Sequence, residues 1–460
     1  MKKSYLLYTA TLMIAILSGC SNVAGQIEEP EEPAPLEFSL TINDDWVWEK
    51  RPLLTVHVEN PNDQPMTAEA KAVITTDKKE AVTTVTSSVE VPGNAGQEIV
   101  LSTGEDLAPG FYRASCSING KAATLQMKNG KIGTFVFGIS PEKIISAPDK
   151  QADFNDFWAA AKAQLAAVDM KAELTEITAY SSASRKVYLL EMQSVPDGPD
   201  GESVTVRGYY LEPQDGARHP VIVHFFGYDD QKPRTKLSCP SGGSSQEFAE
   251  LYLSTRGQII NNRPASLRVE DGKGDFTNIY GDWFAFSFGK KDAYYYRGAF
   301  MDCVQAVRFL ATRPACDMNN IFAEGSSQGG AFSYACAALS DYPLRAIAPC
   351  VAFLGDFPDY FNIVTWPGDT AKKNKGTMTD EQMYAFLSYF DTKNLATRIS
   401  CAVMACSGLQ DGTCPPHTNV APFNNLRSTD KQYYYYPKLQ HEIPGDWQNK
   451  WMKFFRERIQ

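Results

Sequence analysis

The sequence is short of the residue patterns that hold cofactors. Its 460 residues include only five histidines, and they contain no Cys-x-x-Cys pair and no Gly-x-Gly-x-x-Gly. The first absence argues against a zinc ribbon or a dithiol redox centre, and the second argues against a dinucleotide-binding turn. No strand-ending loop carries the lysine of a phosphate-binding loop either. The sequence therefore predicts a protein that works without a metal or an organic cofactor.

The sequence also has fewer positively charged than negatively charged residues. Lysine and arginine number 44 against 54 aspartates and glutamates, which gives a formal net charge of −10. This balance argues against nucleic acid or another anionic polymer as a partner and suits a neutral glycan. Apolar residues make up 43% of the chain, enough to bury two cores in a protein of this length.

Cysteine is present but forms no readable pattern. Of the ten cysteines, Cys20 belongs to the leader discussed below, and the remaining nine cannot all pair within one chain. Cys414 and His417 have a spacing that a metal could use, but two prolines separate them and no second ligand pair accompanies them. We therefore expect no metal site, and no disulfide can be assigned.

What the chain does contain is a serine in a Gly-x-Ser-x-Gly turn, Gly325–Gly329. The preceding residues, Ile321–Glu324, predict a short buried strand, and the following ones, Gly330–Leu339, predict a helix of small residues. Strand, tight turn and helix form the context of a nucleophile elbow, in which the serine stands exposed above the sheet edge. The glycines suit a strained turn whose helix packs close to the strand. Ser327 is therefore the candidate nucleophile; the alternative is a small residue in an ordinary helix-opening turn.

A serine nucleophile needs a base, usually a histidine that a carboxylate orients. In α/β-hydrolases the three follow in the order Ser, Asp or Glu, His, which leaves His417 and His441. We favour His441, because it follows a β-rich run and a sheet of this kind presents catalytic groups in such loops. Asp411, in the loop after the predicted strand Cys401–Cys406, would orient His441 and stabilise its imidazolium. An ordinary Asp-Gly turn is the alternative role for Asp411.

Attack on an ester creates an oxyanion, which requires hydrogen-bond donors. One donor is expected from the backbone N–H of Gln328, the residue after the serine. The other is expected from the backbone of Tyr228, where the apolar strand Pro220–Phe226 runs into Gly227. His224 lies inside that strand and is interpreted as a hydrogen-bonded core histidine.

Several segments of the second part of the chain occur in an order typical of one family. They are Phe154–Trp158, Gly227–Tyr228, Arg256–Gln258, Tyr294–Gly298, Gly325–Gly330, Gly408–Asp411 followed by Pro415–Pro416, and His441–Glu442. From about residue 141 to residue 460, the chain resembles the acetyl xylan esterase and cephalosporin C deacetylase family, carbohydrate esterase family 7. The combination of Arg-Gly-Gln, Gly-x-Ser-Gln-Gly and His-Glu is far more specific than any one of the three.

The resemblance implies an α/β-hydrolase, with a doubly wound and mostly parallel sheet, that removes acetyl groups from sugar hydroxyls. It implies a triad of Ser327, Asp411 and His441, an oxyanion hole from the amides of Tyr228 and Gln328, and supporting roles for Arg256 and Gln258. The chain departs from the family at Phe226, where a histidine usually precedes the Gly-Tyr pair, and this departure bears on the pose of Tyr228. Because the family tends to form ring-shaped hexamers, a homo-oligomer is a further expectation, which the added N-terminal residues could block or decorate.

The first residues have the shape of a bacterial export signal. Two lysines precede an apolar run, Tyr5–Leu17, that is too short to span a bilayer comfortably, and no later transmembrane run occurs. The run ends in Leu-Ser-Gly-Cys, which resembles a lipobox. We therefore predict a signal peptide over residues 1–19, lipidation of Cys20, and an acidic, proline-rich tether over residues 20–35. The expected location is the bacterial cell envelope, periplasmic or surface-exposed, and a plain secretory signal is the alternative.

Residues 36–138 carry the period of β-strands. Apolar residues alternate with polar ones from Leu36 to Ile42 and from Leu54 to Val58. The same alternation precedes Asn119–Gly120, a strong hairpin signal. No helical period appears, and about six to eight short strands suggest an immunoglobulin-like sandwich. We interpret this segment as a spacer or packing module, with a carbohydrate-binding module as the alternative.

The sequence thus predicts a lipid-anchored serine esterase that deacetylates carbohydrates through an acetyl-enzyme, with its hydrolase domain over residues 141–460. Two alternatives remain open. A peptidase of the prolyl oligopeptidase type uses the same fold and triad order but normally carries a much larger N-terminal domain. A non-catalytic glycan-binding lipoprotein could retain the shell of a hydrolase.

Overall fold

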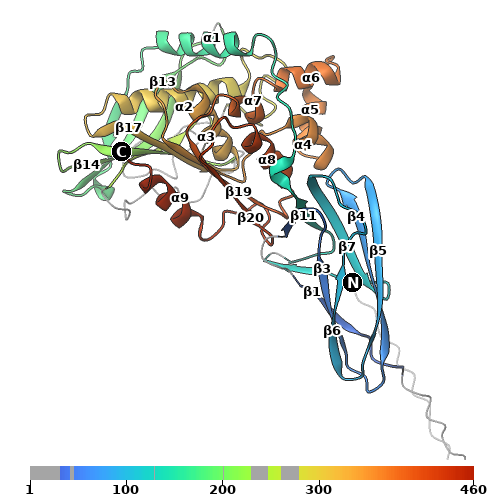
Figure 1. The fold of residues 1–460 in the computed structure, drawn as a ribbon. Helices are drawn as coiled ribbons and strands as arrows, with labels where there is room; N and C mark the ends of the chain where they lie inside the picture. The colour runs from blue at the N-terminus through green and yellow to red at the C-terminus, as the bar shows by residue number, and fades with distance from the viewer. Residues whose placement is uncertain are drawn as a thin grey trace, which may run out of the picture.

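The computed structural model describes residues 32–41, 46–128, 130–199, 201–228, 247–258, 260 and 279–460. Two parts follow each other along the chain: an elongated N-terminal β region, residues 32–139, and a larger α/β region, residues 141–460 (Figure 1). The predicted signal peptide, the lipidation site at Cys20 and most of the tether lie outside the described residues. Residues 32–35 are exposed and have no regular secondary structure.

The N-terminal β region consists of antiparallel sheets. The strands are β1 Glu37–Thr41, β2 Val47–Trp48, β3 Leu54–Asn60, β4 Met66–Thr76, β5 Ala81–Val91, β6 Ala95–Leu101, β7 Gly110–Ile118, β8 Lys121–Ala122, β9 Leu125–Met127, β10 Gly130–Ile132 and β11 Phe135–Ile139. One sheet has the order β1-β3-β6, a larger one has the order β2-β11-β7-β4-β5, and β9 pairs with β10. β2 joins β11 in parallel, whereas the other ladders among the described strands of this region are antiparallel. Alternate residues of β3, β4 and β7 are buried, which is the pattern of sheets with one face in a core.

This region contains more strands than the sequence indicated. Eleven strands lie among the described residues of this region, where about six to eight were expected, and the residues of β5 are mostly exposed. The predicted hairpin turn is present: Asn119 and Gly120 have φ angles of 46° and 76° and join β7 to β8. A two-residue type I′ hairpin turn requires a positive φ angle at both central residues.

The α/β region is built on one large sheet. Its strands are β12 Glu173–Glu176, β13 Arg185–Ser194, β14 Val204–Pro213, β15 His219–Phe225, β16 Ala249–Ser254, β17 Cys316–Ser326, β18 Ala346–Cys350, β19 Ala402–Gly408 and β20 Lys431–Tyr436. Their order is β12-β13-β14-β16-β15-β17-β18-β19-β20. The ladders from β16 to β20 are parallel, and those from β12 to β16 are antiparallel.

Helices cover both faces of this sheet (Figure 1). They are η1 Pro141–Lys143, α1 Phe154–Ala167, η2 Thr178–Tyr180, α2 Tyr295–Ala311, α3 Gln328–Leu339, α4 Phe357–Ile363, α5 Gly368–Asn374, α6 Asp380–Leu387, α7 Thr392–Ala396, α8 Pro416–Asn424 and α9 Trp447–Arg456. Along β17, Ile321 and Ala323 pack in the core that holds α2 and α3, whereas Phe322 packs against α9. Strands buried on both faces read as continuous apolar runs, which is the pattern of the buried strands predicted before Ser327 and before Asp411. Among the described residues, no helix combines the length and the apolar character needed to cross a bilayer.

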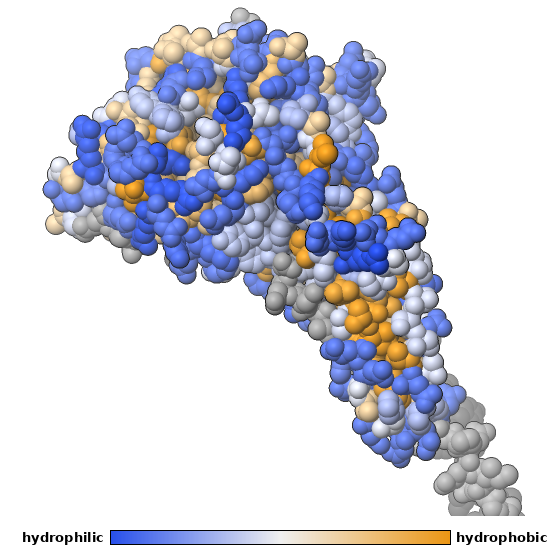
Figure 2. Space-filling model, in the orientation of Figure 1, coloured by the Kyte–Doolittle hydropathy of each residue, from blue (hydrophilic) through white to orange (hydrophobic). Residues whose placement is uncertain are grey.

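The two regions share a packed boundary. Leu409, after β19, and Val420, in α8, are buried within the apolar core of the β region. The side-chain amide of Gln410 exchanges two hydrogen bonds with the backbone of Val136 in β11, at 2.8 and 3.0 Å. On the visible surface, apolar side chains gather on the β region, whereas the α/β region is largely hydrophilic (Figure 2).

Candidate active site

Ser327 occupies the turn between β17 and α3 in a conformation that few serines adopt. Its φ and ψ are 57° and −120°, a strained combination for a residue with a side chain. The backbone holds it on both sides, because its N–H donates to Cys350 and its carbonyl accepts from the N–H of Phe353, at 2.9 and 3.0 Å. A Cβ at Gly325 would lie 2.5 Å from backbone atoms of Gly329, so the turn closes only with glycine there. This is the strand–turn–helix context that the sequence predicted.

His441 and Asp411 lie beside this serine. Nε2 of His441 is 2.9 Å from the Ser327 Oγ, and Nδ1 is 2.8 Å from Oδ2 of Asp411. An ionised carboxylate only accepts, so Nδ1 carries the ring proton and Nε2 is left to accept from the serine hydroxyl. The Asp411 side chain has no exposed surface, whereas the His441 side chain is 28% exposed. The three side chains therefore form a continuous hydrogen-bonded chain that opens to solvent at the imidazole.

Neighbouring strand ends bring the acid and the base together. Asp411 follows β19 and His441 follows β20, and these two strands are parallel neighbours. Their loops touch: a Cβ at Gly408 would lie 2.4 Å from the carbonyl oxygen of Leu439. The second oxygen of Asp411 accepts from the backbone N–H groups of Thr413 and Cys414, both at 2.8 Å. The carboxylate is thus fixed by its own loop before it meets the imidazole.

The two residues predicted to supply oxyanion donors flank the serine. Gln328 is the first residue of α3, and the first N–H groups of a helix have no partner within it. On the other side, the loop after β15 passes close to the elbow, because a Cβ at Gly227 would lie 3.8 Å from the Cβ of Ser327. The side chain of Tyr228 points to Asp282, to which its hydroxyl donates at 2.8 Å.

Gln258 connects these two backbone segments. Its amide nitrogen donates to the carbonyl oxygen of Gly227 at 3.1 Å and to the side-chain oxygen of Gln328 at 2.6 Å. Its own side-chain oxygen accepts from the N–H of Thr255. All of these groups are buried or partly buried, so Gln258 fixes the spacing between the loop after β15 and the start of α3.

Arg256 lies deeper and contacts no member of the Ser–His–Asp chain. Its fully buried guanidinium pairs with Asp302 and Asp197, with nitrogen–oxygen distances of 2.6 Å to each. A Cβ at Gly298 in α2 would lie 2.2 Å from the same guanidinium, so that glycine provides its space. Arg256 joins the strand end at β16 to α2 and anchors the segment that carries Gln258.

His417, the other histidine that fits the triad order, lies elsewhere. Its Nδ1 is 3.0 Å from Asp77 of the β region, and its Nε2 is 3.0 Å from Asp359. Burial opposes a charge on His417, but hydrogen bonds to the surrounding carboxylates outweigh it and hold the pKa of the imidazole well above its ordinary value. Sequence reasoning missed this role, since the partner Asp77 is 340 positions away along the chain.

The carboxylates around His417 are not free to act as a metal cage. Asp356, Asp359 and His417 lie close enough together to share an ion. However, Lys393 contacts Asp356 at 2.9 Å and Lys78 contacts Asp359 at 2.5 Å. Such a donor set fits an ion-pair network better than a divalent cation. His224, by contrast, is the buried core histidine that was expected: its Nδ1 lies 2.7 Å from Glu324.

The family follows from comparison with known proteins. The family model described as acetyl xylan esterase (AXE1) matches residues 142–458, which is more than half of the chain. The chain belongs to the acetyl xylan esterase family. The predicted family resemblance is thereby confirmed, and the protein is a carboxylic ester hydrolase. The match begins where the N-terminal β region ends.

Individual relatives agree with this assignment. The esterase is 24% identical over 388 residues to an acetyl esterase of Xylanibacter ruminicola, which covers 81% of this chain and 80% of that protein. Two solved structures are similar, each covering 69% of this chain and 98% of its own. They are an acetyl xylan esterase of a Paenibacillus species, 27% identical with a TM-score of 0.58, and acetyl xylan esterase 1 of a Thermoanaerobacterium species, 26% identical with a TM-score of 0.57. The predicted α/β-hydrolase fold of the second region is confirmed by these likenesses.

Proposed function

We propose that this esterase removes acetyl groups from acetylated carbohydrates, with Ser327 as nucleophile, His441 as general base and acid, and Asp411 as the group that orients His441. The observation that carries the proposal is the 2.9 Å contact between Nε2 of His441 and the Ser327 hydroxyl, with Asp411 behind the ring. Family membership supports the substrate class.

The reaction would proceed in two halves. Ser327 Oγ attacks the acetyl carbonyl while its proton passes to Nε2 of His441, and Asp411 stabilises the imidazolium that forms. The tetrahedral intermediate collapses when His441 returns the proton to the sugar oxygen, which leaves as the alcohol. Water then attacks the acetyl-enzyme, again with His441 as base, and acetate is released with Ser327 restored. Apart from water, each reacting group in these steps belongs to the chain or to the substrate.

The oxyanion of each intermediate would be stabilised by the backbone N–H groups of Tyr228 and Gln328. Gln258 supports this assignment because it contacts both segments at once. In our proposal Gln258 and Arg256 are positioning residues: they fix the two donors and touch no reacting atom. Phe226, where the family usually has histidine, changes a side chain and leaves the backbone donor after Gly227 available.

The decisive experiment compares substrates and one substitution. We expect the wild type to hydrolyse p-nitrophenyl acetate and acetylated xylo-oligosaccharides, and Ser327→Ala to lose both activities. Cleavage of an Ala-Pro anilide without release of acetate from sugars would instead identify a peptidase. A wild type that binds acetylated sugars and hydrolyses none of these substrates would identify a non-catalytic glycan-binding protein.

We further propose that residues 36–138 form an immunoglobulin-like sandwich domain and residues 141–460 the hydrolase domain. The antiparallel sheets of the first segment and the start of the family match at residue 142 support this division. Limited proteolysis tests it: cuts confined to residues 138–142 would support the boundary, and cuts within β3 to β7 would contradict it. Association into a homo-oligomer is proposed from the family resemblance and is tested by light scattering.

We also propose that the mature protein is anchored in the bacterial cell envelope through lipid on Cys20. The lysines, the apolar run and the Leu-Ser-Gly-Cys sequence at the N-terminus support it. The wild type should fractionate with membranes, and Cys20→Ser should be recovered in the soluble fraction with its esterase activity retained. Equal fractionation of the two proteins would contradict the anchor.

A further inference from the structure

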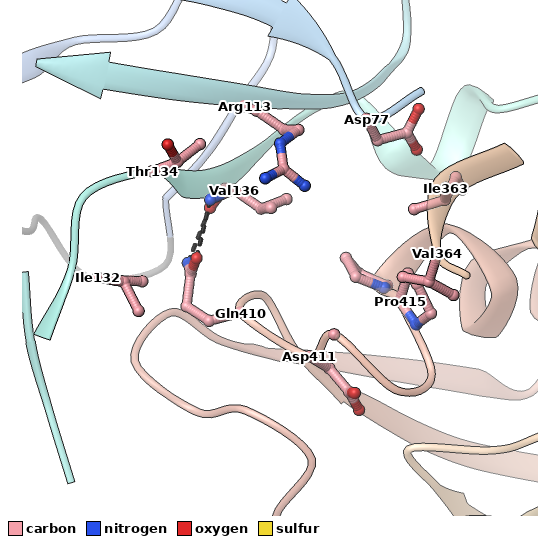
Figure 3. A pocket seen from close by; sticks show the side chains of 12 residues that line it. Asp77, Arg113, Ile132, Thr134, Val136, Ile363, Val364, Gln410, Asp411 and Pro415 are labelled. Atoms are coloured by element: carbon pink, nitrogen blue, oxygen red, sulfur yellow. Dashed lines mark hydrogen bonds between the residues drawn. The ribbon is translucent and has the colours of Figure 1, made fainter. Parts of the chain in front are cut away.

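A cavity lies between the N-terminal β region and the α/β region, and we name it the junction cavity. Its volume is about 170 Å³, and it is bounded by strands β7 and β11, by the loop that carries Asp411 and by the end of α4. The side chains around it include Arg113, Thr134, Val136, Val364 and Pro415 (Figure 3). Gln410 borders it through the two hydrogen bonds that join it to the backbone of β11. Both regions are therefore needed to form this cavity.

A second hollow adjoins the junction cavity and is lined on one side by Trp366 and Thr413. Its volume is about 330 Å³, and it shares Arg113, Val364 and Gly412 with the junction cavity. Its wall also includes Lys79 of the β region and Trp366 of the α/β region. One continuous depression thus runs from the β region across the Asp411 loop.

Trp366 connects this depression with the serine. Its half-buried ring stacks on Phe353 at 5.0 Å between ring centroids and meets the ring of Tyr228 edge-on at 5.7 Å. Phe353 is the residue whose N–H donates to the carbonyl of Ser327, and Tyr228 carries a proposed oxyanion donor. A ligand whose acetylated sugar reaches Ser327 can therefore extend past Trp366 toward the β region.

Arg113 is a half-buried cation that none of the described residues neutralises. Figure 3 shows its guanidinium directed into the junction cavity. The neighbouring carboxylates are engaged elsewhere, Asp77 with His417 and Asp411 with His441. Because removing a charge from water costs free energy unless the charge is paired, the position suits an anion that arrives with a ligand.

We propose that Arg113, with Lys79 beside it, binds the carboxylate of a uronic acid carried by the acetylated glycan. This inference rests on the proposed function and adds an acidic subsite to it. A guanidinium offers paired N–H donors that match the two oxygens of a carboxylate, which an isolated ammonium does not. The net charge of −10 disfavours a densely anionic polymer, so a glycan with isolated uronates fits better than a polyuronate.

The test compares two acetylated xylo-oligosaccharides that differ only in one glucuronate branch. Arg113→Gln should lower kcat/KM on the branched substrate by about tenfold or more, since a hydrogen bond to a charged group contributes that much. It should leave kcat/KM on p-nitrophenyl acetate and on the unbranched substrate unchanged. Arg113→Lys should retain part of the preference, because it keeps the charge and loses the paired donors. The matched control is Arg51→Gln, which removes an exposed β-region arginine that pairs with Asp106.

A binding measurement separates this subsite from the chemistry. In a Ser327→Ala background, calorimetry should show that Arg113→Gln lowers the affinity for the branched ligand about tenfold and leaves the affinity for the unbranched ligand unchanged. Equal losses on both ligands, or none, would overturn the subsite. So would inorganic phosphate displacing the branched ligand as well as a second branched oligosaccharide does, because that result indicates a general anion site. A wild type inactive on p-nitrophenyl acetate would refute the proposed function instead, and the calorimetric result would still decide the subsite.

Discussion

The surroundings of His441 and His417 differ although both imidazoles meet aspartates. His441 contacts one carboxylate and one hydroxyl, and more than a quarter of its side chain is exposed. His417 is buried between Asp77, Asp359 and Asp356, with oxygens at 3.0, 3.0 and 3.5 Å. The first site can exchange a proton with a substrate, whereas the second holds its proton in a closed network. What distinguishes a base from a structural cation here is the number of carboxylates around it and its access to solvent.

Both sites take a residue from the same short segment. Asp411, in the loop before α8, contacts His441, and His417, in the first turn of α8, contacts Asp77 of the β region. The N-terminal β region is thus tied to the same short segment that orients the proposed base. Substitution of His441 should therefore lower activity, whereas substitution of His417 should lower the stability of the folded protein.

The largest expected difference concerns activity. We expect His441→Ala to lower kcat on p-nitrophenyl acetate by about 10⁴-fold or more, because the serine loses its base. His417→Ala should lower it by less than about tenfold at a temperature where the protein stays folded, since His417 contacts no reacting group. Initial rates of the two variants, with circular dichroism to verify folding, test this contrast. An equal loss in both would show that His417 takes part in the reaction.

The next largest effect is on stability, and here His417 and not His441 is the residue whose loss matters more. His417→Ala should lower the free energy of unfolding by about 3–5 kcal/mol, because it removes a buried cation that three carboxylates share. Asp356 and Asp359 keep their lysine partners, but the buried Asp77 loses its contact with the imidazole. Urea denaturation measures this loss. The control is His57→Ala, which removes a partly exposed histidine that lies 3.3 Å from Glu59, and we expect no measurable change in stability there. A His417→Ala protein as stable as the wild type would show that the network contributes nothing.

A smaller effect is expected from the residue that spaces the proposed oxyanion donors. Gln258→Leu should lower kcat by about tenfold to a hundredfold with little change in KM, because loosened donors act mainly on the transition state. Gln258→Glu should not restore the activity, because a carboxylate cannot donate to the carbonyl oxygen of Gly227 or to the side-chain oxygen of Gln328. A change in KM alone would indicate that Gln258 shapes substrate binding.

The sequence predicted the elbow and its partners through local signals. Gly325 and Gly329 mark a turn that tolerates no side chain, and the apolar run before Asp411 marks the strand that carries it. The link between Asp77 and His417 was beyond such reasoning, because it depends on how two regions meet. The same holds for Arg113: its position in an alternating strand predicts only that it faces away from a core, and not what lies opposite. Long-range pairing of charges leaves no period and no spacing in the chain.

The smallest predicted effect is a pH dependence that belongs to the His417 network. The pKa of His417 is raised, so its contribution to stability is complete below its unfolded value near 6.5 and is lost as pH rises through the folded value. Asp356 behaves oppositely: burial opposes its charge, but His417 and Lys393 lower its pKa, so its contribution is lost as pH falls below about 3.8. The melting temperatures of the wild type and His417→Gln should therefore differ most near pH 6. Between pH 6 and alkaline pH the gap should narrow by on the order of a few degrees. A gap that stays constant over this range would mean that His417 does not carry the charge assigned to it.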